Sequence, residues 1–435
     1  MELPSMANSQ PVMSSNSSSR RRVVITGLGP IAACGIGKEQ FWRNVRAGRS
    51  GISRLAAFSV EGCRAVSVGE IPEWDPTAFF PPHRLKRLDR FAQFAVASAL
   101  LALEDAKLPW SREAPQPRTG VSFGTALGGI SGAEDEHARF LKKGPRGVNP
   151  TLALQVFGGS AHSNIAIECG FRGVGTTNSS SCASGVVSVG EAMRYIRDGW
   201  VDVMVAGGAE APLSPLTFSS FDFIKTMSRW DGEPIQHACR PFDKQRDGFT
   251  MGEGGCSLVI EELNHARARG AHIYAEVCGY ALNNDAYHMT SPNPDGESIT
   301  SCMAAALADA GVAPHQIGYI NCHASSTQLN DASEVECIKR VFGDHAARLA
   351  IGGTKPFTAH PLGATGAMEA VICALALDEQ WLPPTLHHRT PDPACDLDIV
   401  PNEGRNAAFD FALNNAFGFG GINSSIVLRR WKDES

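Results

Sequence analysis

Hydrophobic residues recur along the chain at two spacings, which together predict alternating helices and strands. The spacing of an amphipathic helix is clearest in two segments, Phe91, Phe94, Ala97 and Leu101, and Val186, Val189, Met193 and Ile196. Short apolar runs, several of them ending at glycines, predict buried strands at 23–29, 121–123, 201–206, 252–262, 317–321, 349–352 and 411–414. We expect Gly207 and Gly208 to end the strand at 201–206. This alternation is typical of mixed α/β sheets covered by helices.

The order of these elements occurs twice. Each half contains a strand, a turn of small residues, a long apolar helix and then a strand with glycines, and the second cycle begins near residue 275. This order indicates an internal duplication, with one half at 23–274 and the other at 275–431.

The first 22 residues differ from the rest of the chain. They are rich in serine, end in three arginines and lack the apolar region of a secretory signal. We therefore predict a disordered tail at 1–22, with order beginning at Val23. A short organelle transit peptide is the alternative.

Composition excludes several classes of protein. The chain has 435 residues and a formal net charge of −6, whereas a general nucleic-acid binder would carry a basic face. No apolar run is long enough to span a bilayer. The 12 cysteines show no CxxC or Cys/His ligand spacing, which argues against a metal site and a disulfide framework. Such unpaired cysteines indicate a reducing compartment, so we expect a cytoplasmic protein.

Cys182 is a candidate nucleophile. It lies in a run of small residues that ends in Ser181-Cys182-Ala183 and opens the predicted helix that contains Val186. Backbone N–H groups and the helix dipole should favour a thiolate at this position. The alternative is a small buried apolar cysteine, which is the usual environment of a free cysteine.

Seven motifs resemble those of the β-ketoacyl-acyl carrier protein synthases, in particular the group called synthase II. In the family's order they are SCASG around Cys182, VMVAGGAE at 203–210, RPFD and RDGF within 240–249, NDAYHMTSP at 284–292, NCHASST around His323, GTKPFTAHPLGATGAMEA at 353–370 and NNAFGFGGIN at 414–423. This resemblance spans residues 22–430. It implies the thiolase fold, in which two βαβαβαββ halves form a five-layered αβαβα body, and it implies a homodimer.

Joining two thioesters through a carbon–carbon bond needs a nucleophile for one acyl chain and donors for an enolate. The resemblance assigns the acyl chain to Cys182 and decarboxylation to His323 and His360. It places the oxyanion between the backbone N–H groups of Cys182 and Phe419. A histidine picked without these motifs would be a surface or satisfied core residue, which is the alternative for both.

The resemblance also implies roles for supporting residues. Lys355 and Glu369 match a buried ion pair, although an exposed lysine is the alternative. Phe419, with Phe417 beside it, matches a gate at the pocket mouth rather than an ordinary core aromatic. Ser325 and Thr327 match hydroxyls that bind the phosphopantetheine arm, and loop hydroxyls that bond their own backbone are the alternative.

These features predict an acyltransferase that condenses an acyl chain on Cys182 with malonyl-acyl carrier protein. The products would be 3-oxoacyl-acyl carrier protein and CO2, as in fatty-acid elongation. No cofactor is expected to bind, because the phosphopantetheine arm arrives on the carrier protein.

Departures from the family pattern leave the pathway open. They are Ala324 and Ser325 after the first histidine, Gln328 to Asp331 further on, and Ala359 and Pro361 around the second. The alternative is a ketosynthase of a type II polyketide or polyene pathway, paired with a subunit that resembles a chain-length factor.

Three related classes fit less well. A degradative thiolase would have a second cysteine within 414–422, and a synthase III or chalcone type would have asparagine in place of His360. A catalytically silent chain-length factor would lack Cys182.

An acidic carrier protein needs a basic docking surface on this acidic chain. We predict one from the following residues: Arg84, Lys86, Arg87, Arg90, Lys142, Lys143, Arg146 and Arg229. Solvated charges at a helix start are the alternative.

Overall fold

The computed structural model describes residues 20–432 of the chain. Ten strands form one continuous hydrogen-bonded path. We describe it as two five-stranded sheets, with the orders β6-β5-β7-β9-β1 and β12-β11-β15-β16-β10. The first sheet contains β1 (Val23–Ala32), β5 (Thr119–Gly124), β6 (Gly175–Asn178), β7 (Val203–Glu210) and β9 (Gly254–Glu262). The second contains β10 (Ala275–Asn284), β11 (Ile317–Asn321), β12 (Ala350–Gly352), β15 (Phe411–Gly418) and β16 (Ile422–Arg430). The sheets join at one end, where Val24 and Ile25 pair with Glu276 and Ala275.

The two sheets have the same topology, which confirms the predicted duplication. In each sheet the second and third strands of the half are parallel to one another, and the fourth joins them in parallel. The fifth strand is antiparallel to both the fourth and the first.

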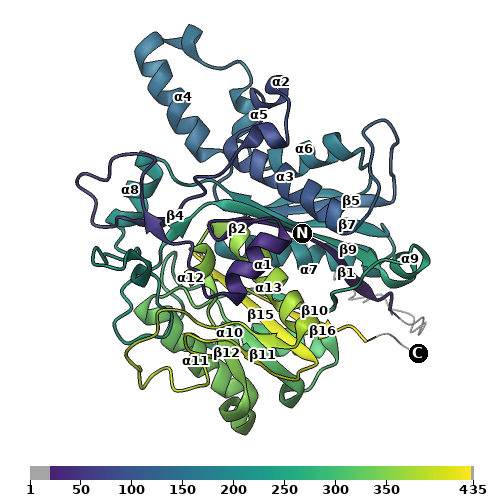
Figure 1. Ribbon diagram of the computed structural model, residues 1–435, viewed down its shortest axis with the longest axis vertical. Coiled ribbons are helices and arrows are strands. Elements are labelled where there is room, and N and C mark those ends of the chain that lie inside the picture. Colours follow the sequence, from purple (N-terminus) through teal and green to yellow (C-terminus); the bar gives the residue numbers. More distant parts are fainter. Residues whose placement is uncertain (1–19, 433–435) are drawn as a thin grey trace, which may run out of the picture.

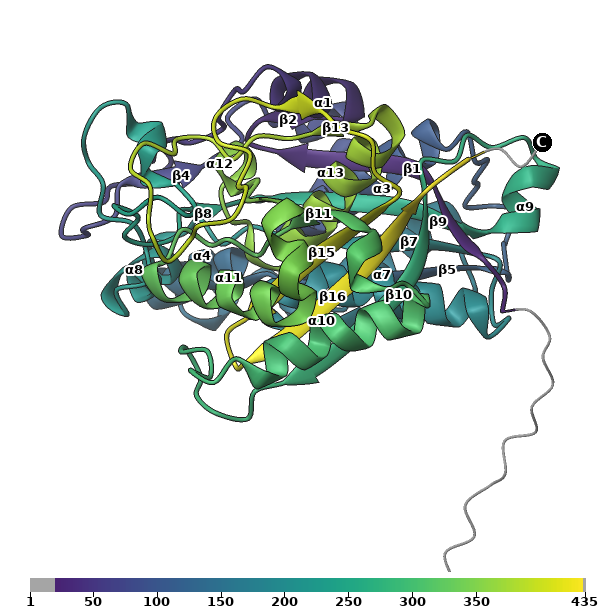
Figure 2. The same ribbon diagram turned by 90° about the horizontal axis from the view of Figure 1, so that it is seen from below.

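Six helices cover and separate these sheets. The helices are α3 (Arg90–Asp105), α6 (Ser160–Cys169), α7 (Ser184–Arg197), α10 (Glu297–Ala310), α11 (Gln328–Phe342) and α13 (Thr365–Glu379). In Figures 1 and 2, α3 and α6 cover the first sheet, α10 and α11 cover the second, and α7 and α13 lie between the sheets. This is the five-layered αβαβα arrangement of the thiolase fold, as expected.

The middle layer explains why α13 is apolar on all sides. Every residue from Thr365 to Leu377 is buried, because the helix has a sheet on each face and α7 beside it. Side chains of α7, α13 and the inner faces of both sheets form the largest apolar cluster. Two further clusters lie beneath the outer helices.

Shorter elements surround this body. They are α1 (Lys38–Arg46), α2 (Pro82–Leu85), α4 (Ile130–Lys143), α5 (Leu152–Val156), α8 (Pro215–Phe223), α9 (Leu263–Ala268) and α12 (Lys355–Thr358), with β2 (Gly35–Ile36), β3 (Ser53–Arg54), β4 (Ser67–Gly69), β8 (Met251–Gly252), β13 (Trp381–Leu382) and β14 (Arg405–Asn406). Figure 1 shows α4 extending away from the layered body. No helix within residues 20–432 combines the length and apolarity that crossing a bilayer requires.

The prediction that Gly207 and Gly208 end their strand is wrong. β7 continues through both glycines to Glu210, paired with β9. A Cβ at Gly207 would lie 1.9 Å from the carbonyl oxygen of Cys256, and one at Gly208 would lie 2.3 Å from that of Gly363. These glycines therefore permit close packing of the backbone rather than a turn. β15 likewise continues past residue 414 to Gly418, because it pairs with β16 over its whole length.

The tail prediction needs a correction at its end. Residues 1–19 lie outside the described residues, so the prediction is open for them. Arg21 forms an ion pair with Asp202, and Arg22 forms one with Glu276 of β10. The folded body therefore holds these two arginines through charge pairs, which the composition of the tail did not reveal.

Candidate active site

Cys182 lies in a single turn of 3-10 helix, Ser181–Ala183, between β6 and α7. Its side chain is 8% exposed and lines a cavity of about 340 Å³. Burial raises the pKa of the Cys182 thiol to about 11, and the Ser181 hydroxyl, the Lys355 charge and the Phe419 N–H oppose this effect. Burial is therefore the largest effect on this thiol, and it opposes the thiolate expected at the start of the helix.

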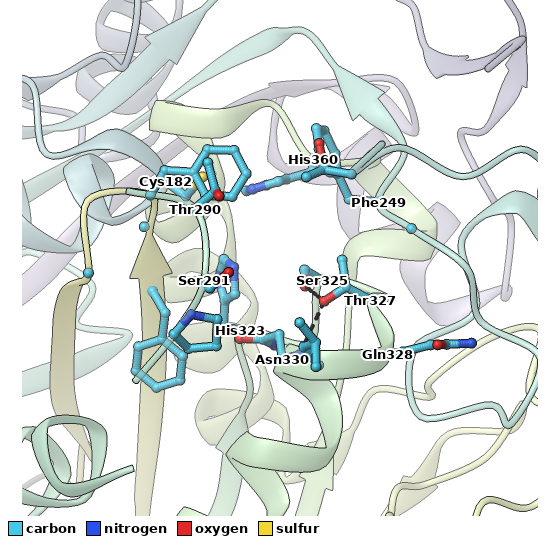
Figure 3. A pocket seen from close by; sticks show the side chains of 18 of the residues that line it. Cys182, Phe249, Thr290, Ser291, His323, Ser325, Thr327, Gln328, Asn330 and His360 are labelled. Atoms are coloured by element: carbon cyan, nitrogen blue, oxygen red, sulfur yellow. Dashed lines mark hydrogen bonds between the residues drawn. The ribbon is translucent and has the colours of Figure 1, made fainter. Parts of the chain in front are cut away.

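The second half of the chain delivers two histidines to the same cavity. His323 follows β11, and His360 follows α12; their ring centroids are 5.5 Å apart. In Figure 3 the ring of His360 extends toward Cys182, and His323 lies further along the cavity. The structure thus brings together the three residues that the motifs singled out.

Both histidines are fixed through their backbone or ring. The backbone N–H of His323 donates to Glu334 Oε1 at 2.9 Å, and the Lys355 ammonium donates to the backbone carbonyl of His323. His360 Nδ1 lies 2.8 Å from the Thr365 hydroxyl. Burial, together with the Lys355 charge, lowers the pKa of both imidazoles well below 6.5. Both rings are therefore neutral at pH 7, and each can carry a hydrogen-bond donor.

Lys355 and Glu369 form the predicted buried contact. Their side chains are 1% and 2% exposed, and Lys355 Nζ lies 2.7 Å from Glu369 Oε1. Burial raises the pKa of Glu369 to about 7, against the opposing charge of Lys355. The alternative of an exposed lysine is excluded by this burial.

The other predicted residues also line the cavity. Phe419 stacks on Phe221 with ring centroids 6.4 Å apart, and Phe417 packs 5.7 Å from the His323 ring. Ser325 Oγ and Thr327 Oγ1 are 3.0 Å apart. Figure 3 marks this hydrogen bond with a dashed line. Thr327 also caps α11 by accepting from the Asn330 N–H, so the alternative role in local backbone bonding applies to it as well.

The predicted docking residues divide into two arginines with acidic partners and a set of exposed cations. Arg84 pairs with Glu168, and Arg90 makes a two-point contact with Glu253, so these two arginines stabilise the fold. Lys86 and Arg87 are exposed in the turn before α3. The remaining exposed residues divide between the end of α4, with Lys142, Lys143 and Arg146 nearby, and the cavity, which Arg229 lines.

Sequence reasoning missed three groups around the site. Lys225 is an exposed cation that lines the cavity with Arg229. Glu334 holds the His323 loop from α11, and Thr365 orients the His360 ring. The motif around His360 includes Thr365, but spacing along the chain does not reveal these contacts. In the described part of the chain, no group of three or more potential ligands could hold a metal ion.

A nucleophilic cysteine and two neutral histidines in one cavity of a thiolase fold define a class of enzyme that transfers acyl groups. Comparison with known proteins identifies the family: residues 20–266 match "Beta-ketoacyl synthase, N-terminal domain", and residues 274–389 match "Beta-ketoacyl synthase, C-terminal domain". The chain belongs to the β-ketoacyl synthase family and is an acyltransferase.

Similar proteins are related over almost the whole chain. The "3-oxoacyl-[acyl-carrier-protein] synthase 2" of Synechocystis sp. is 40% identical over 413 residues, which cover 95% of this chain and 99% of that protein. The synthase of the same name from Coxiella burnetii is also 40% identical, with 94% and 99% covered. A type II polyketide ketosynthase in complex with its acyl-carrier protein has a TM-score of 0.88 at 37% identity, and the ishigamide ketosynthase/chain length factor has 0.88 at 36%. Each comparison covers 95% of this chain and 100% of the other.

Proposed function

We propose that this enzyme condenses an acyl chain, held as a thioester on Cys182, with malonyl-acyl carrier protein in fatty-acid elongation. The observation that carries the proposal is the shared cavity of Cys182 and the neutral pair His323 and His360. Names of the curated relatives, which are 3-oxoacyl-acyl carrier protein synthases, support it. The products would be 3-oxoacyl-acyl carrier protein and CO2.

The first step loads the acyl chain. Cys182 Sγ attacks the acyl thioester while its proton passes to a neutral imidazole, since the thiol is protonated in the free enzyme. The oxyanion would lie between the backbone N–H groups of Cys182 and Phe419, and the Phe419 N–H already bonds to Cys182. Collapse releases the pantetheine sulfur, which takes up the proton. The acyl chain is then bound to the enzyme.

The second step produces the carbon nucleophile. Neutral rings at His323 and His360 can donate N–H groups to the carbonyl oxygen of malonyl thioester, and His360 does so from Nε2 in the tautomer whose Nδ1 accepts from the Thr365 hydroxyl. Loss of CO2 leaves an enolate that these donors stabilise. The enolate carbon attacks the acyl carbonyl, and the Cys182 sulfur departs as a thiolate that takes up a proton from solvent. Atoms and charge balance without a metal or redox cofactor bound by the protein.

The substrate arm would enter along the polar side of the cavity. Ser325 and Thr327 offer hydroxyls to the amides of a phosphopantetheine arm, and Phe419 at the rim would gate its entry. Because this arm is carried by the acyl carrier protein, we propose that no further cofactor binds.

Incubation with acyl carrier proteins of different chain length tests the function. Mass spectrometry should detect an acyl adduct on Cys182, and malonyl-acyl carrier protein should then release CO2 and 3-oxoacyl product. A protein that stays unmodified with every chain length, or is modified only at other cysteines, would contradict the proposal. Chain preference also separates the two pathways. Long saturated chains would indicate fatty-acid elongation, and short polyketide or polyene chains would indicate a type II polyketide or polyene pathway.

The alternative function is a ketosynthase of a type II polyketide or polyene pathway. Two solved structures favour it, because one is a type II polyketide ketosynthase and the other a ketosynthase/chain length factor. The substitutions Ala324 and Ser325 in the predicted pantetheine path are compatible with an unusual substrate.

We also propose a homodimer, with pairing to a chain-length-factor-like subunit as the alternative. The edge strand β6 is partly exposed, and Phe140, Leu154 and Phe157 on or near α4 and α5 are at least 41% exposed. Light scattering of the purified protein would distinguish a dimer from a monomer that needs another subunit. We place the enzyme in the cytoplasm, because all twelve cysteines are unpaired.

We expect docking of the carrier protein to depend on exposed cations such as Lys86 and Arg87. Reversing Lys86 and Arg87 to glutamate should raise the apparent KM for acyl-acyl carrier protein by roughly tenfold, since it weakens attraction to an acidic partner. Turnover of a small pantetheine thioester should change little. Replacing Lys225 and Arg229 by glutamate tests in the same way whether the cations at the cavity bind the carrier protein.

A matched control changes the net charge equally at a distant place. Lys107 and Arg112 are exposed beyond the opposite end of α3. Their reversal should leave both substrates unaffected. Equal loss with carrier protein and small thioester in the Lys86 and Arg87 variant would contradict docking there.

A further inference from the structure

Glu210 is a buried carboxylate that the reaction steps above do not use. It ends β7, and its side chain is fully buried. Its oxygens accept from the Thr125 hydroxyl at 2.9 Å and from the backbone N–H groups of Ala126 at 2.5 Å, Leu127 at 3.0 Å and Gly363 at 3.0 Å. All four donors are uncharged. A buried carboxylate satisfied by neutral donors in this way needs an explanation, because burying its charge is costly.

These bonds join two loops from different halves of the molecule. Ala126 and Leu127 follow β5 in the first half, whereas Gly363 lies in the turn between His360 and α13 in the second. A Cβ on Gly363 would lie 2.6 Å from the Ala126 nitrogen and 2.7 Å from Glu210 Oε2. Glycine at 363 therefore lets the turn that follows His360 approach the carboxylate closely.

Both loops also carry leucines in or against the apolar cluster that contains Cys182. Leu362 belongs to the same apolar cluster as Cys182, and Leu127 packs against that cluster. Leu362 has a φ of 34°, in the left-handed region that leucine rarely adopts. Such a conformation persists where neighbouring groups hold it, and the Gly363 N–H bonded to Glu210 is the next group in the chain.

We propose that Glu210 is a positioning residue that ties the His360 turn to the β5 loop. It thereby sets the position of Leu362, which lines the cavity with Cys182 and against which the bound acyl chain must fit. This inference rests on the condensing function proposed above and deepens it.

Replacing Glu210 by glutamine tests the inference. Glutamine turns one of the accepting oxygens into a donor. At the Oε1 position this donor faces the Leu127 N–H, and at the Oε2 position it faces those of Ala126 and Gly363, so part of the tie between the loops is lost in either orientation. We expect kcat for condensation to fall about 100-fold, as for a misplacement of about 1 Å, with little change in KM for the carrier protein.

Alkylation of Cys182 gives a readout that a merely structural role would not move. Burial is the main cause that raises the pKa of Cys182, and the Glu210 charge adds a smaller increase, so in E210Q the pH midpoint of iodoacetamide alkylation should shift slightly downward. Other titratable groups lie near Cys182 or line the same cavity, and all remain in the variant: Lys355, His323, His360, Lys225, Arg229, Asp247 and Asp285. A merely less stable protein would lose active fraction without this shift.

The matched control is another buried carboxylate far from the cavity. Glu261 on β9 accepts from Thr26, His265 and Arg269, and its side chain is 0% exposed. E261Q should lower stability but leave kcat unchanged when it is normalised to the fraction of protein whose Cys182 can be alkylated. Equal loss in E261Q and E210Q, or wild-type kcat and midpoint in E210Q, would overturn the proposal.

The second variant, E210D, keeps the charge but is one methylene shorter. It should lower kcat and leave the alkylation midpoint unchanged. This variant therefore tests the positioning role of Glu210 even if E210Q does not fold. E210D with wild-type kcat would overturn the proposal. If the wild-type enzyme condenses nothing, the proposed function fails, while the alkylation profiles still test the position of Cys182.

Discussion

Cys182→Gln is expected to abolish acyl loading and condensation while preserving the release of CO2 from malonyl-acyl carrier protein. An amide cannot form the thioester, but its size and polarity resemble an acylated cysteine, so the cavity should stay formed. Decarboxylation requires only malonyl thioester, the neutral pair His323 and His360, and a site for the enolate. The rate of CO2 release should equal or exceed that of wild type without an acyl primer. The assay is formation of CO2 and acetyl-acyl carrier protein.

Two further variants assign this activity to the histidines. His323→Ala or His360→Ala, each combined with Cys182→Gln, should reduce CO2 release by about 100-fold or more, as is typical when a donor to a developing oxyanion is removed. Loss of decarboxylation in a folded Cys182→Gln protein would show that the thiol takes part in both steps. That result would contradict the division of the reaction proposed here.

The protonation state of the histidines gives the same experiment a pH dependence. Burial lowers the pKa of both rings well below 6.5, so they stay neutral through the range in which an exposed histidine gains a proton. CO2 release by Cys182→Gln should therefore not fall as the pH is lowered through 6.5. A fall centred there would indicate solvent-exposed rings.

Glu369→Ala is expected to lower the free energy of unfolding by about 3–5 kcal/mol and to reduce activity. The substitution leaves the Lys355 ammonium without its carboxylate at a position only 1% exposed. The same ammonium donates to the carbonyl of His323, so its displacement would also move a residue of the active site. Urea unfolding and melting temperature measure the first effect, and CO2 release measures the second.

A surface ion pair provides the control. Lys339 and Asp396 pair with side chains 36% and 56% exposed, so Asp396→Ala should cost only about 0–1 kcal/mol. Glu369→Gln keeps the size and one acceptor, and its stability should lie between those of Glu369→Ala and wild type. A Glu369→Ala protein that melts like wild type would show that the buried pair does not stabilise the fold.

Much of the fold was predictable because each layer has its own pattern of apolar residues. α13 is buried on all sides and therefore reads as a continuous apolar run, whereas α3 faces solvent on one side. The strands were found by short apolar runs, but glycines gave wrong ends for β7 and an early end for β15. A glycine that allows two backbones to touch has the same sequence signal as one that makes a turn.

The active-site cysteine and histidines were also predictable, because few residue types can act as an acyl carrier or an enolate donor. Positions on the surface were not. Arg84 and Arg90 looked like docking cations in a basic run, but their partners Glu168 and Glu253 lie 84 and 163 positions further along the chain. Local charge cannot reveal such pairs.

The sequence by itself determined the duplicated α/β fold and singled out Cys182, His323 and His360, which the structure brings to one cavity. Tertiary structure decided their protonation states, since burial is the largest cause that raises the pKa of Cys182 and lowers those of the two histidines. It also decided which residues support the site, such as Glu210, which binds Gly363 across 153 positions. The physical reason is that desolvation and hydrogen bonding depend on neighbours in space, and the layered fold brings together loops that are far apart along the chain.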